Sequence, residues 1–278
     1  RFFTKALKKC GYLNFDEPFK NLLTQGMVCH QTFKDQKGDW VYPSDAMLGE
    51  NGDFIHIKTK EKLVVGRSEK MSKSKKNVVE PLNIIDAYGA DTARLFMLSD
   101  TPPERNLEWS DAGIDGAWKY INRVYKLVVS HKSLVVSGDV EFGSATKEQQ
   151  GLIKLNHKTI FAVKSELEKM GFNRAIAKIR EFSNALEKFE IKDQVDQKIM
   201  SFSLHNLVLL ISPIMPHLAE ELWKTLGNQA IISQSVSFPH SDESLIIDDQ
   251  VSIAVQVNGK LRSVLATPKS STKEELEK

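Results

Sequence analysis

The sequence predicts a mixed, mainly helical fold in three parts: short strands and helices, then an antiparallel helical bundle, then a hairpin that starts a small α/β domain. Three observations predict it. Turn-forming residues crowd 30–66, apolar residues recur at helical spacing across 111–227, and strict alternation leads into an Asn-Gly pair after residue 250. With 278 residues, 41% of them hydrophobic, and a net charge of +2, the chain is long enough for two modest domains and is not strongly basic.

The first part contains a β-rich insertion at residues 30–66. The strings "DQKGDW", "YPSD" and "GENGDF" are typical of turns, and short alternating apolar runs lie between them. Two short helices are expected to follow. Pro81 suits a first helical turn, and Gly89 can end that helix with a positive φ. Asp91 is then expected to cap the second helix, with Arg94 in a neighbouring salt bridge.

The second part carries apolar stripes on consecutive segments, which is typical of helices packed in a bundle. The third segment is expected to begin at Asn173 as its N-cap, and the fifth to stop at Gly227. The five predicted helices cover 111–130, about 146–170, 173–189, a fourth from about 195 that ends before Pro213, and 216–227.

The third part begins with a hairpin. Valine and isoleucine alternate with smaller or polar residues across 251–257, Asn258-Gly259 follows, and the return strand is expected at 260–265. The chain begins at Arg1 rather than Met and ends in "SSTKEELEK", which resembles the start of another helix. These features predict a piece of a longer protein.

Composition excludes several classes of protein. The most apolar run, 207–215, has half the length of a membrane span and is interrupted by Pro213. Cys10 and Cys29 are too few for a disulfide framework and fit a reducing compartment. Without a CxxC pair, they are expected to be ordinary thiols rather than metal ligands.

One short run, "EKMSKSKKN" at 69–77, points to chemistry. Lysine is a compact point charge that suits phosphate oxygens, and small serines and backbone N–H groups add donors without bulk. Such groups stabilise the charge that develops when a triphosphate is attacked. From residue types alone a solvated linker remains open, and composition favours it over a phosphate-binding loop.

The segment Lys70–Ser74 matches the KMSKS signature of class I aminoacyl-tRNA synthetases. Around it, "EPFKNLLTQGMV", "NVVEPLNIIDAYGADTARLFML", "RNLEWSDAGIDGAWKYINRVYKLV", "ISPIMPHLAEELWKTLG" and "VQVNGKLR" resemble leucyl-tRNA synthetases of the bacterial type, in order along essentially the whole chain. The resemblance implies that 1–112 is the distal part of a Rossmann-type catalytic domain with a leucine-specific insertion at 30–66. It further implies an α-helical anticodon-binding domain at 113–242 and the truncated start of a C-terminal domain at 243–278.

The same resemblance implies ATP-dependent activation of leucine to leucyl-adenylate and transfer to tRNA(Leu), in a cytoplasmic monomer that does not contact membranes. Magnesium is expected to accompany ATP, with no metal site built by the protein. Lys70 and Lys73 are expected to neutralise charge on the phosphates and the departing pyrophosphate. Ser72 and Ser74 are expected to shape the loop or donate to oxygens, and Met71 to anchor it.

The helical part is expected to meet tRNA through its basic side chains. Contacts to phosphates give salt-dependent affinity with little sequence preference, and the family relies little on anticodon bases. Arg123 and Lys126, one turn apart, are the candidate contacts, while any single basic residue is more often a solvated surface group. The basic residues of these helices include Lys119, Lys158, Lys164, Arg174, Lys178 and Arg180.

The sequence departs from the family in one respect. None of its seven histidines begins the His-x-Gly-His signature that family catalysis also needs, and the leucine pocket and editing domain have no counterpart here. The segment alone is therefore expected to be inactive. Two alternatives stay open: a sibling synthetase for isoleucine, valine or methionine, and a non-catalytic tRNA-binding remnant. The absent zinc motifs and the insertion before the loop count against the sibling.

Overall fold

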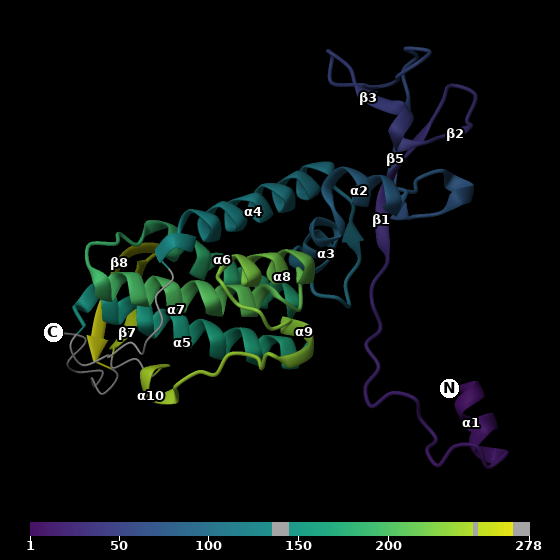
Figure 1. The fold of residues 1–278 in the computed structure, drawn as a ribbon. Helices are drawn as coiled ribbons and strands as arrows, with labels where there is room; N and C mark the ends of the chain where they lie inside the picture. The colour runs from purple at the N-terminus through teal and green to yellow at the C-terminus, as the bar shows by residue number, and fades with distance from the viewer. Residues whose placement is uncertain (135–144, 247–249, 269–278) are drawn as a thin grey trace. The chain divides into compact units, whose positions relative to one another are not determined.

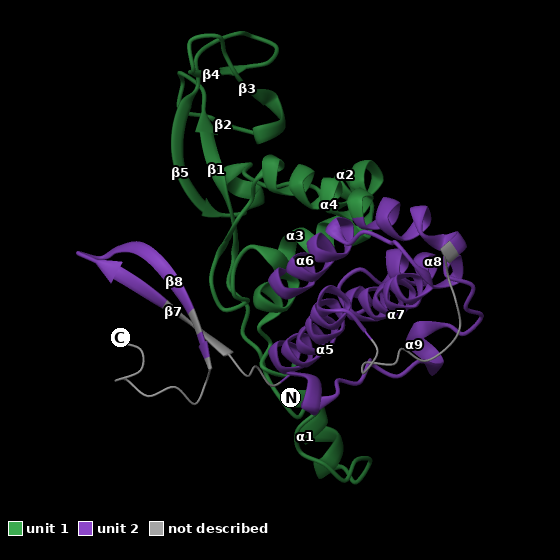
Figure 2. Ribbon diagram, turned by 90° about the vertical axis from the view of Figure 1, so that its left-hand side faces the viewer, with its two compact units in different colours: residues 1–123, 168–176 green, residues 124–167, 177–278 purple. Residues whose placement is uncertain are grey.

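The computed structural model describes residues 1–134, 145–246 and 250–268 (Figure 1). It divides into two compact units, one formed by 1–123 with 168–176 and the other by 124–167 with 177–278 (Figure 2). Helices dominate and the strands form small sheets, so the prediction of a mixed, mainly helical fold is confirmed. Within the described ranges, no helix combines the length and apolar character that crossing a membrane requires.

The first unit is organised around strand β1 (Val28–Lys34), which is the hub of a four-stranded sheet. β1 pairs antiparallel with β2 (Trp40–Val41) and β5 (Val64–Lys70), and parallel with β6 (Leu107–Glu108). A separate hairpin joins β3 (Ala46–Leu48) to β4 (Phe54–His56). The strands predicted within 30–66 are therefore present, and β5 continues beyond them to Lys70. Among the described strands of this unit, only β1 and β6 pair in parallel, so the Rossmann-type topology stays a prediction.

A small apolar core holds the insertion together. Phe33, Val41 and Leu63 are buried against one another, and Phe54 packs onto them with its ring centroid 5.0 Å from that of Phe33. Since a cluster this small buries little apolar area, the insertion also depends on the hydrogen bonds that β1 makes within the sheet. This core fixes the two strands, β1 and β5, that border the Lys/Ser run.

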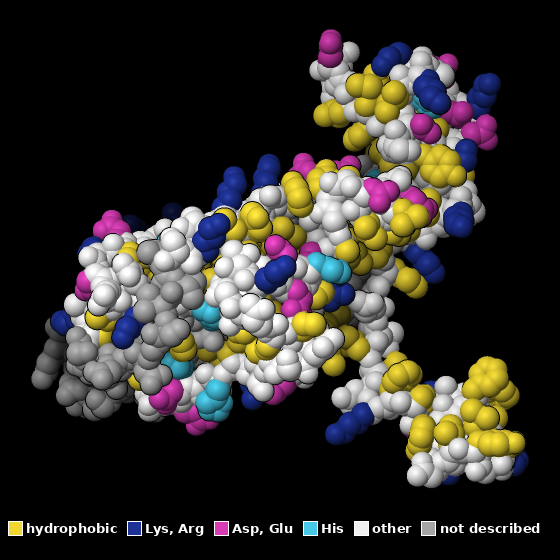
Figure 3. All heavy atoms as spheres, in the orientation of Figure 1, with side chains coloured by type: hydrophobic (Ala, Val, Ile, Leu, Met, Phe, Trp, Pro, Cys, Tyr) yellow, Lys and Arg dark blue, Asp and Glu magenta, His cyan; other side chains and the backbone are white. Residues whose placement is uncertain are grey.

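The helices of the first unit are α1 (Phe2–Lys9), α2 (Pro81–Tyr88) and α3 (Ala90–Ser99). Gly89 ends α2 at a φ of +82°, as predicted. The prediction that Asp91 caps the next helix is wrong: Gly89 is also the N-cap of α3, and Asp91 lies in its first turn. A carboxylate there still interacts favourably with the helix dipole. α1 buries none of its residues, and apolar side chains crowd its surface (Figure 3).

The helices predicted for the bundle are present: α4 (Asp111–Ser130), α5 (Lys147–Glu168), α6 (Phe172–Lys188), α7 (Gln194–Ile211) and α8 (Pro216–Thr225). Most residues of the predicted apolar stripes are buried, but Trp118, Tyr125, Val195 and Phe202 are exposed. Asn173 is not an N-cap as predicted, because Met170 reverses the chain at a φ of +58° and the Gly171 carbonyl accepts the first helical bond from Ala175. Gly227 has a φ of +87° and follows the last turn of α8.

Helix α7 is the most buried element of the second unit. Its last five residues, Leu207 through Ile211, are all buried, as expected of a helix in the centre of a bundle. Two short helices, α9 (Ile232–Ser235) and α10 (Glu243–Ile246), follow α8. The predicted hairpin is confirmed as β7 (Gln250–Val257) and β8 (Lys260–Pro268), with positive φ at both Asn258 and Gly259. The return strand runs three residues beyond the predicted end.

Candidate functional site

The Lys/Ser run forms a closed loop between β5 and α2. Lys70 is the last residue of β5, and residues 73–75 make one turn of 3-10 helix, η2 (Lys73–Lys75). Lys76 follows in the left-handed conformation, with a φ of 52°. The five residues predicted to bind ATP, 70–74, therefore lie together on one short excursion of the chain.

Asn77, a residue that the sequence reasoning missed, closes the base of this loop. It is fully buried. Its Oδ1 accepts a hydrogen bond from the Ser72 N–H at 2.9 Å, and its Nδ2 donates to the carbonyls of Glu69 at 3.0 Å, Lys70 at 3.3 Å and His30 at 3.1 Å. One side chain thus ties the end of the loop to its beginning and to β1. The only sign of it in the sequence is an amide between a lysine run and two valines.

The four lysines of the run occupy different environments. Lys70 and Lys73 are exposed, whereas Lys75 and Lys76 are half-buried. Lys75 pairs with Glu69, and Lys76 Nζ lies 5.5 Å from the centroid of the Tyr42 ring. The two lysines predicted to meet phosphates are therefore the two most open to solvent.

The uncharged residues of the loop have structural contacts. Met71 is half-buried, and its N–H donates to the Val28 carbonyl at 3.0 Å, which extends the pairing of β1 and β5. The hydroxyls of Ser72 and Ser74 hydrogen-bond to each other at 2.7 Å. In this conformation both serines shape the loop.

Lys73 borders a hollow of about 500 Å³. The hollow combines this ammonium with the carboxylates of Glu80 and Asp111, and apolar wall is supplied by Val78 and Ile84. His30 and the Tyr42–Ser44 segment of the insertion complete its edge. A ligand that enters this hollow therefore meets both positively and negatively charged side chains rather than a uniformly basic patch.

Arg123 and Lys126, the predicted tRNA contacts, belong to α4 rather than to the loop. Both are exposed. The Arg123 guanidinium carbon lies 5.3 Å from the ring centroid of Tyr120, one turn earlier on the same helix. Stacking of this kind holds the charged group at the surface, where a phosphate can reach it.

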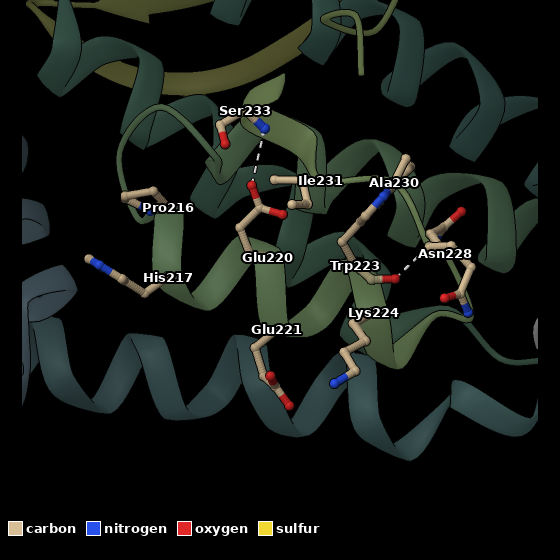
Figure 4. Close-up of a pocket in the computed structure, with 11 residues that line it drawn as sticks. Pro216, His217, Glu220, Glu221, Trp223, Lys224, Asn228, Ala230, Ile231 and Ser233 are labelled. Carbon is tan, nitrogen blue, oxygen red and sulfur yellow. Dashed lines mark hydrogen bonds between the residues drawn. The ribbon is translucent and has the colours of Figure 1, made fainter. Parts of the chain in front are cut away.

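A second hollow lies beside α8, and its polar groups serve the local fold (Figure 4). The Glu220 carboxylate accepts from the N–H groups of Ile232 at 3.0 Å and Ser233 at 3.1 Å, and Asn228 donates to the Trp223 carbonyl at 3.1 Å. Burial alone would raise the pKa of Glu220, but these donors outweigh it and the pKa is lowered. Glu220 therefore caps α9 and holds the α8–α9 turn.

A metal centre is not apparent in the described part of the chain, where no group of three or more His, Cys, Asp or Glu residues is placed to hold an ion. Both cysteines are free thiols; Cys10 is exposed and Cys29 is buried. The segment 69–77 carries four lysines against the single carboxylate of Glu69, which suits an anionic ligand.

Comparison with known proteins gives a consistent family. The model of the anticodon-binding domain of tRNA ligase matches residues 149–277, and the model of class I tRNA synthetases for I, L, M and V matches 35–110. Leucine–tRNA ligase of Paramagnetospirillum magneticum is 48% identical over 97% of this chain, and that of Rhizorhabdus wittichii is 44% identical over all of it. The chain spans 31% of the length of each of these curated relatives.

A solved structure agrees with the sequence relatives. The crystal structure of the LeuRS–tRNA–LeuAMS ternary complex from Agrobacterium radiobacter K84 superposes on all of this chain with a TM-score of 0.67 at 27% identity, and 31% of that chain is covered. Sequence identity, family models and fold therefore point the same way: over its whole length the chain is similar to one part of the leucine–tRNA ligases, which are class I tRNA synthetases.

Proposed function

We propose that this chain works as part of a leucine–tRNA ligase, the enzyme that activates leucine with ATP and transfers it to tRNA(Leu). The observation that carries the proposal is the closed loop at 69–77, which holds Lys70 and Lys73 exposed, in a chain 48% identical to such a ligase. Its share of the work is an ATP-binding loop and a helical tRNA-binding surface. The rest of the catalytic site belongs to the remaining length of the enzyme, since the relatives are about three times longer.

The loop serves the first reaction step. The leucine carboxylate oxygen attacks the α-phosphorus of ATP, the bond to the bridging oxygen of the β-phosphate breaks, and magnesium pyrophosphate leaves. Negative charge grows on the oxygens of the leaving group. The ammonium groups of Lys70 and Lys73 stabilise that charge, and because Asn77 fixes the base of the loop, little reorganisation is needed when they engage it.

The helical part serves tRNA binding. Its exposed basic residues, with Arg123 and Lys126 on α4 as the principal candidates, contact tRNA phosphates rather than anticodon bases. A LeuRS crystal structure that superposes on this chain contains tRNA and LeuAMS, which supports tRNA as a partner of this chain and an adenylate site in the whole enzyme. The enzyme acts in the cytoplasm as a monomer, with domain boundaries near 112/113 and 242/243.

The test separates the two roles. The 278-residue chain should bind fluorescent tRNA(Leu), with affinity that falls steeply as salt rises. The double variant Arg123→Ala/Lys126→Ala should weaken binding by about tenfold, at about fivefold or less per lost phosphate contact. Lys147→Ala, which removes an exposed charge from α5, is the matched control and should change little.

Catalysis is tested by leucine-dependent pyrophosphate exchange. The chain alone should show none, and the full-length enzyme that contains it should exchange pyrophosphate with leucine and with no other aliphatic amino acid at comparable rate. Exchange that prefers isoleucine, valine or methionine would assign the chain to a sibling enzyme. A parent protein that binds tRNA but performs no exchange would assign it to a non-catalytic tRNA-binding protein.

A further inference from the structure

The insertion and the loop meet at Tyr42. This residue lies between β2 and the 3-10 turn η1 (Pro43–Asp45), and it is 40% exposed. Lys76 Nζ lies 5.5 Å from its ring centroid, within the range at which an ammonium is attracted to an aromatic face. The contact joins two segments that are more than thirty residues apart in the sequence.

Lys76 has an uncommon backbone conformation. Its φ of 52° lies in the left-handed region, which residues with a side chain adopt rarely because Cβ crowds the following carbonyl. Strained conformations of this kind persist where the surroundings hold them and are frequent at sites that must be positioned. Here the surroundings are the Tyr42 ring on one side and the buried Asn77 next in the chain.

Tyr42 also borders two hollows beside the loop. With Lys76 it lines a hollow whose other walls include Asp35 and Asp39 of the insertion. With Lys73 it lines the hollow described above, next to α2. One residue of the insertion therefore contacts Lys76 through its ring and lines the same hollow as Lys73.

We propose that Tyr42 is a positioning residue for the loop. By stacking on Lys76 it holds the C-terminal end of the loop in its strained conformation. This in turn fixes the position of Lys73 before a triphosphate binds. The catalytic consequence rests on the function proposed for Lys73, whereas the coupling between Tyr42 and the loop does not. The insertion thereby acts on the loop through a specific side chain and not through its bulk.

Hydrogen exchange of the backbone amides at 72–77, measured in the 278-residue chain, tests the coupling. Tyr42→Leu removes the aromatic face and should speed exchange there by about two- to fivefold. Tyr42→Phe keeps the face and should restore the slower exchange. Lys76→Met should match Tyr42→Leu, and the double variant should exceed neither single variant, because the two residues share one interaction.

Lys60→Met is the matched control. Lys60 also has a positive φ, of 60°, but its Nζ lies 3.8 Å from the Met47 sulfur instead of over a ring. The Lys60→Met variant should leave backbone hydrogen exchange at 72–77 unchanged. Unchanged exchange in Tyr42→Leu, or additive effects in the double variant, overturns the proposal.

Kinetics in the full-length enzyme test the consequence. Tyr42→Leu should lower kcat for leucine-dependent pyrophosphate exchange by about two- to fivefold without changing the KM for leucine, and Tyr42→Phe should restore kcat. Faster hydrogen exchange with unchanged kcat overturns the positioning role. If the unmodified enzyme shows no leucine-dependent pyrophosphate exchange, the proposed function fails. The hydrogen exchange of the amides at 72–77 still decides whether Tyr42 positions the loop.

Discussion

Gln149 joins the N-terminus of α5 to that of α7, since its Nε2 donates to Asp196 Oδ1 at 2.8 Å. Each residue also completes a capping box on its own helix. Gln149 Oε1 accepts from the Thr146 N–H at 2.8 Å, and the Asp196 N–H donates to Asp193 at 2.8 Å. Both side chains are at least 95% buried, so two helix starts are locked together by one interior hydrogen bond.

The Gln149–Asp196 hydrogen bond predicts that the stability of the fold decreases in acid. Burial alone would raise the pKa of Asp196, but donors from Gln149 and from the backbone N–H groups of Lys192 and Asp193 outweigh it and lower the pKa below its ordinary value. A carboxyl with a lowered pKa stabilises the fold above its unfolded pKa, and this stabilisation disappears as the pH falls through the folded pKa. We therefore expect the free energy of unfolding to drop as the pH falls below about 4.

Asp196→Asn tests the prediction. An amide cannot accept from Gln149 and from both backbone groups, so the variant should lose about 1–3 kcal/mol at pH 7 in urea unfolding followed by circular dichroism. The loss should shrink near pH 3, below the ordinary pKa of an unfolded aspartate, because proton binding by the unfolded chain then reduces the contribution of the native carboxylate to stability. Glu190→Gln, at a carboxylate whose side chain is 78% exposed, is the control and should match the unmodified chain. An Asp196→Asn deficit that is equal at both pH values would contradict the assignment.

A second buried contact between α5 and α7 consists of hydrogen bonds between uncharged side chains. Asn156 is fully buried; its Nδ2 donates to the Ser203 hydroxyl at 3.0 Å and its Oδ1 accepts from Asn206 at 3.1 Å. Asn156→Leu should cost about 2–3 kcal/mol, because it leaves two buried polar partners without this hydrogen bond. The triple variant Asn156→Leu/Ser203→Ala/Asn206→Leu should recover most of that loss in the same urea measurement. A triple variant less stable than the single one would show that packing, not hydrogen bonding, sets the cost.

Local sequence predicted the elements well wherever one residue dictates the backbone. Asn258-Gly259 requires positive φ at both positions and forms the hairpin turn, and Pro81 opens α2. Caps were less predictable, since Asp91 and Asn173 both suit an N-cap chemically but lie inside helices that begin earlier. Asn77 was not predictable at all, because its four partners include a carbonyl on β1 that only the folded sheet brings near.

Asn77→Asp should open the base of the loop. The change replaces an amide donor, which faces three carbonyl oxygens, by a carboxylate that these oxygens repel. A cost of about 2 kcal/mol in closing the loop raises its open population by about 30-fold. Trypsin should then cut after the loop lysines faster by that factor, while cutting elsewhere is unchanged. Asn51→Asp, the same change on an exposed turn, should have no effect, and equal loop cleavage in both variants would refute the role of Asn77.

Lys73→Ala tests the chemistry assigned to the loop. In the full-length enzyme it should lower kcat for leucine-dependent pyrophosphate exchange by about 10²–10³-fold, the usual effect of removing one donor to developing charge. The KM for leucine should stay the same, because the lost interaction forms only in the transition state. Lys75→Ala is the control: that ammonium already pairs with Glu69, so its loss should cost less than about tenfold. Equal losses in the two variants would mean that the loop supplies only diffuse positive charge and that Lys73 has no special role.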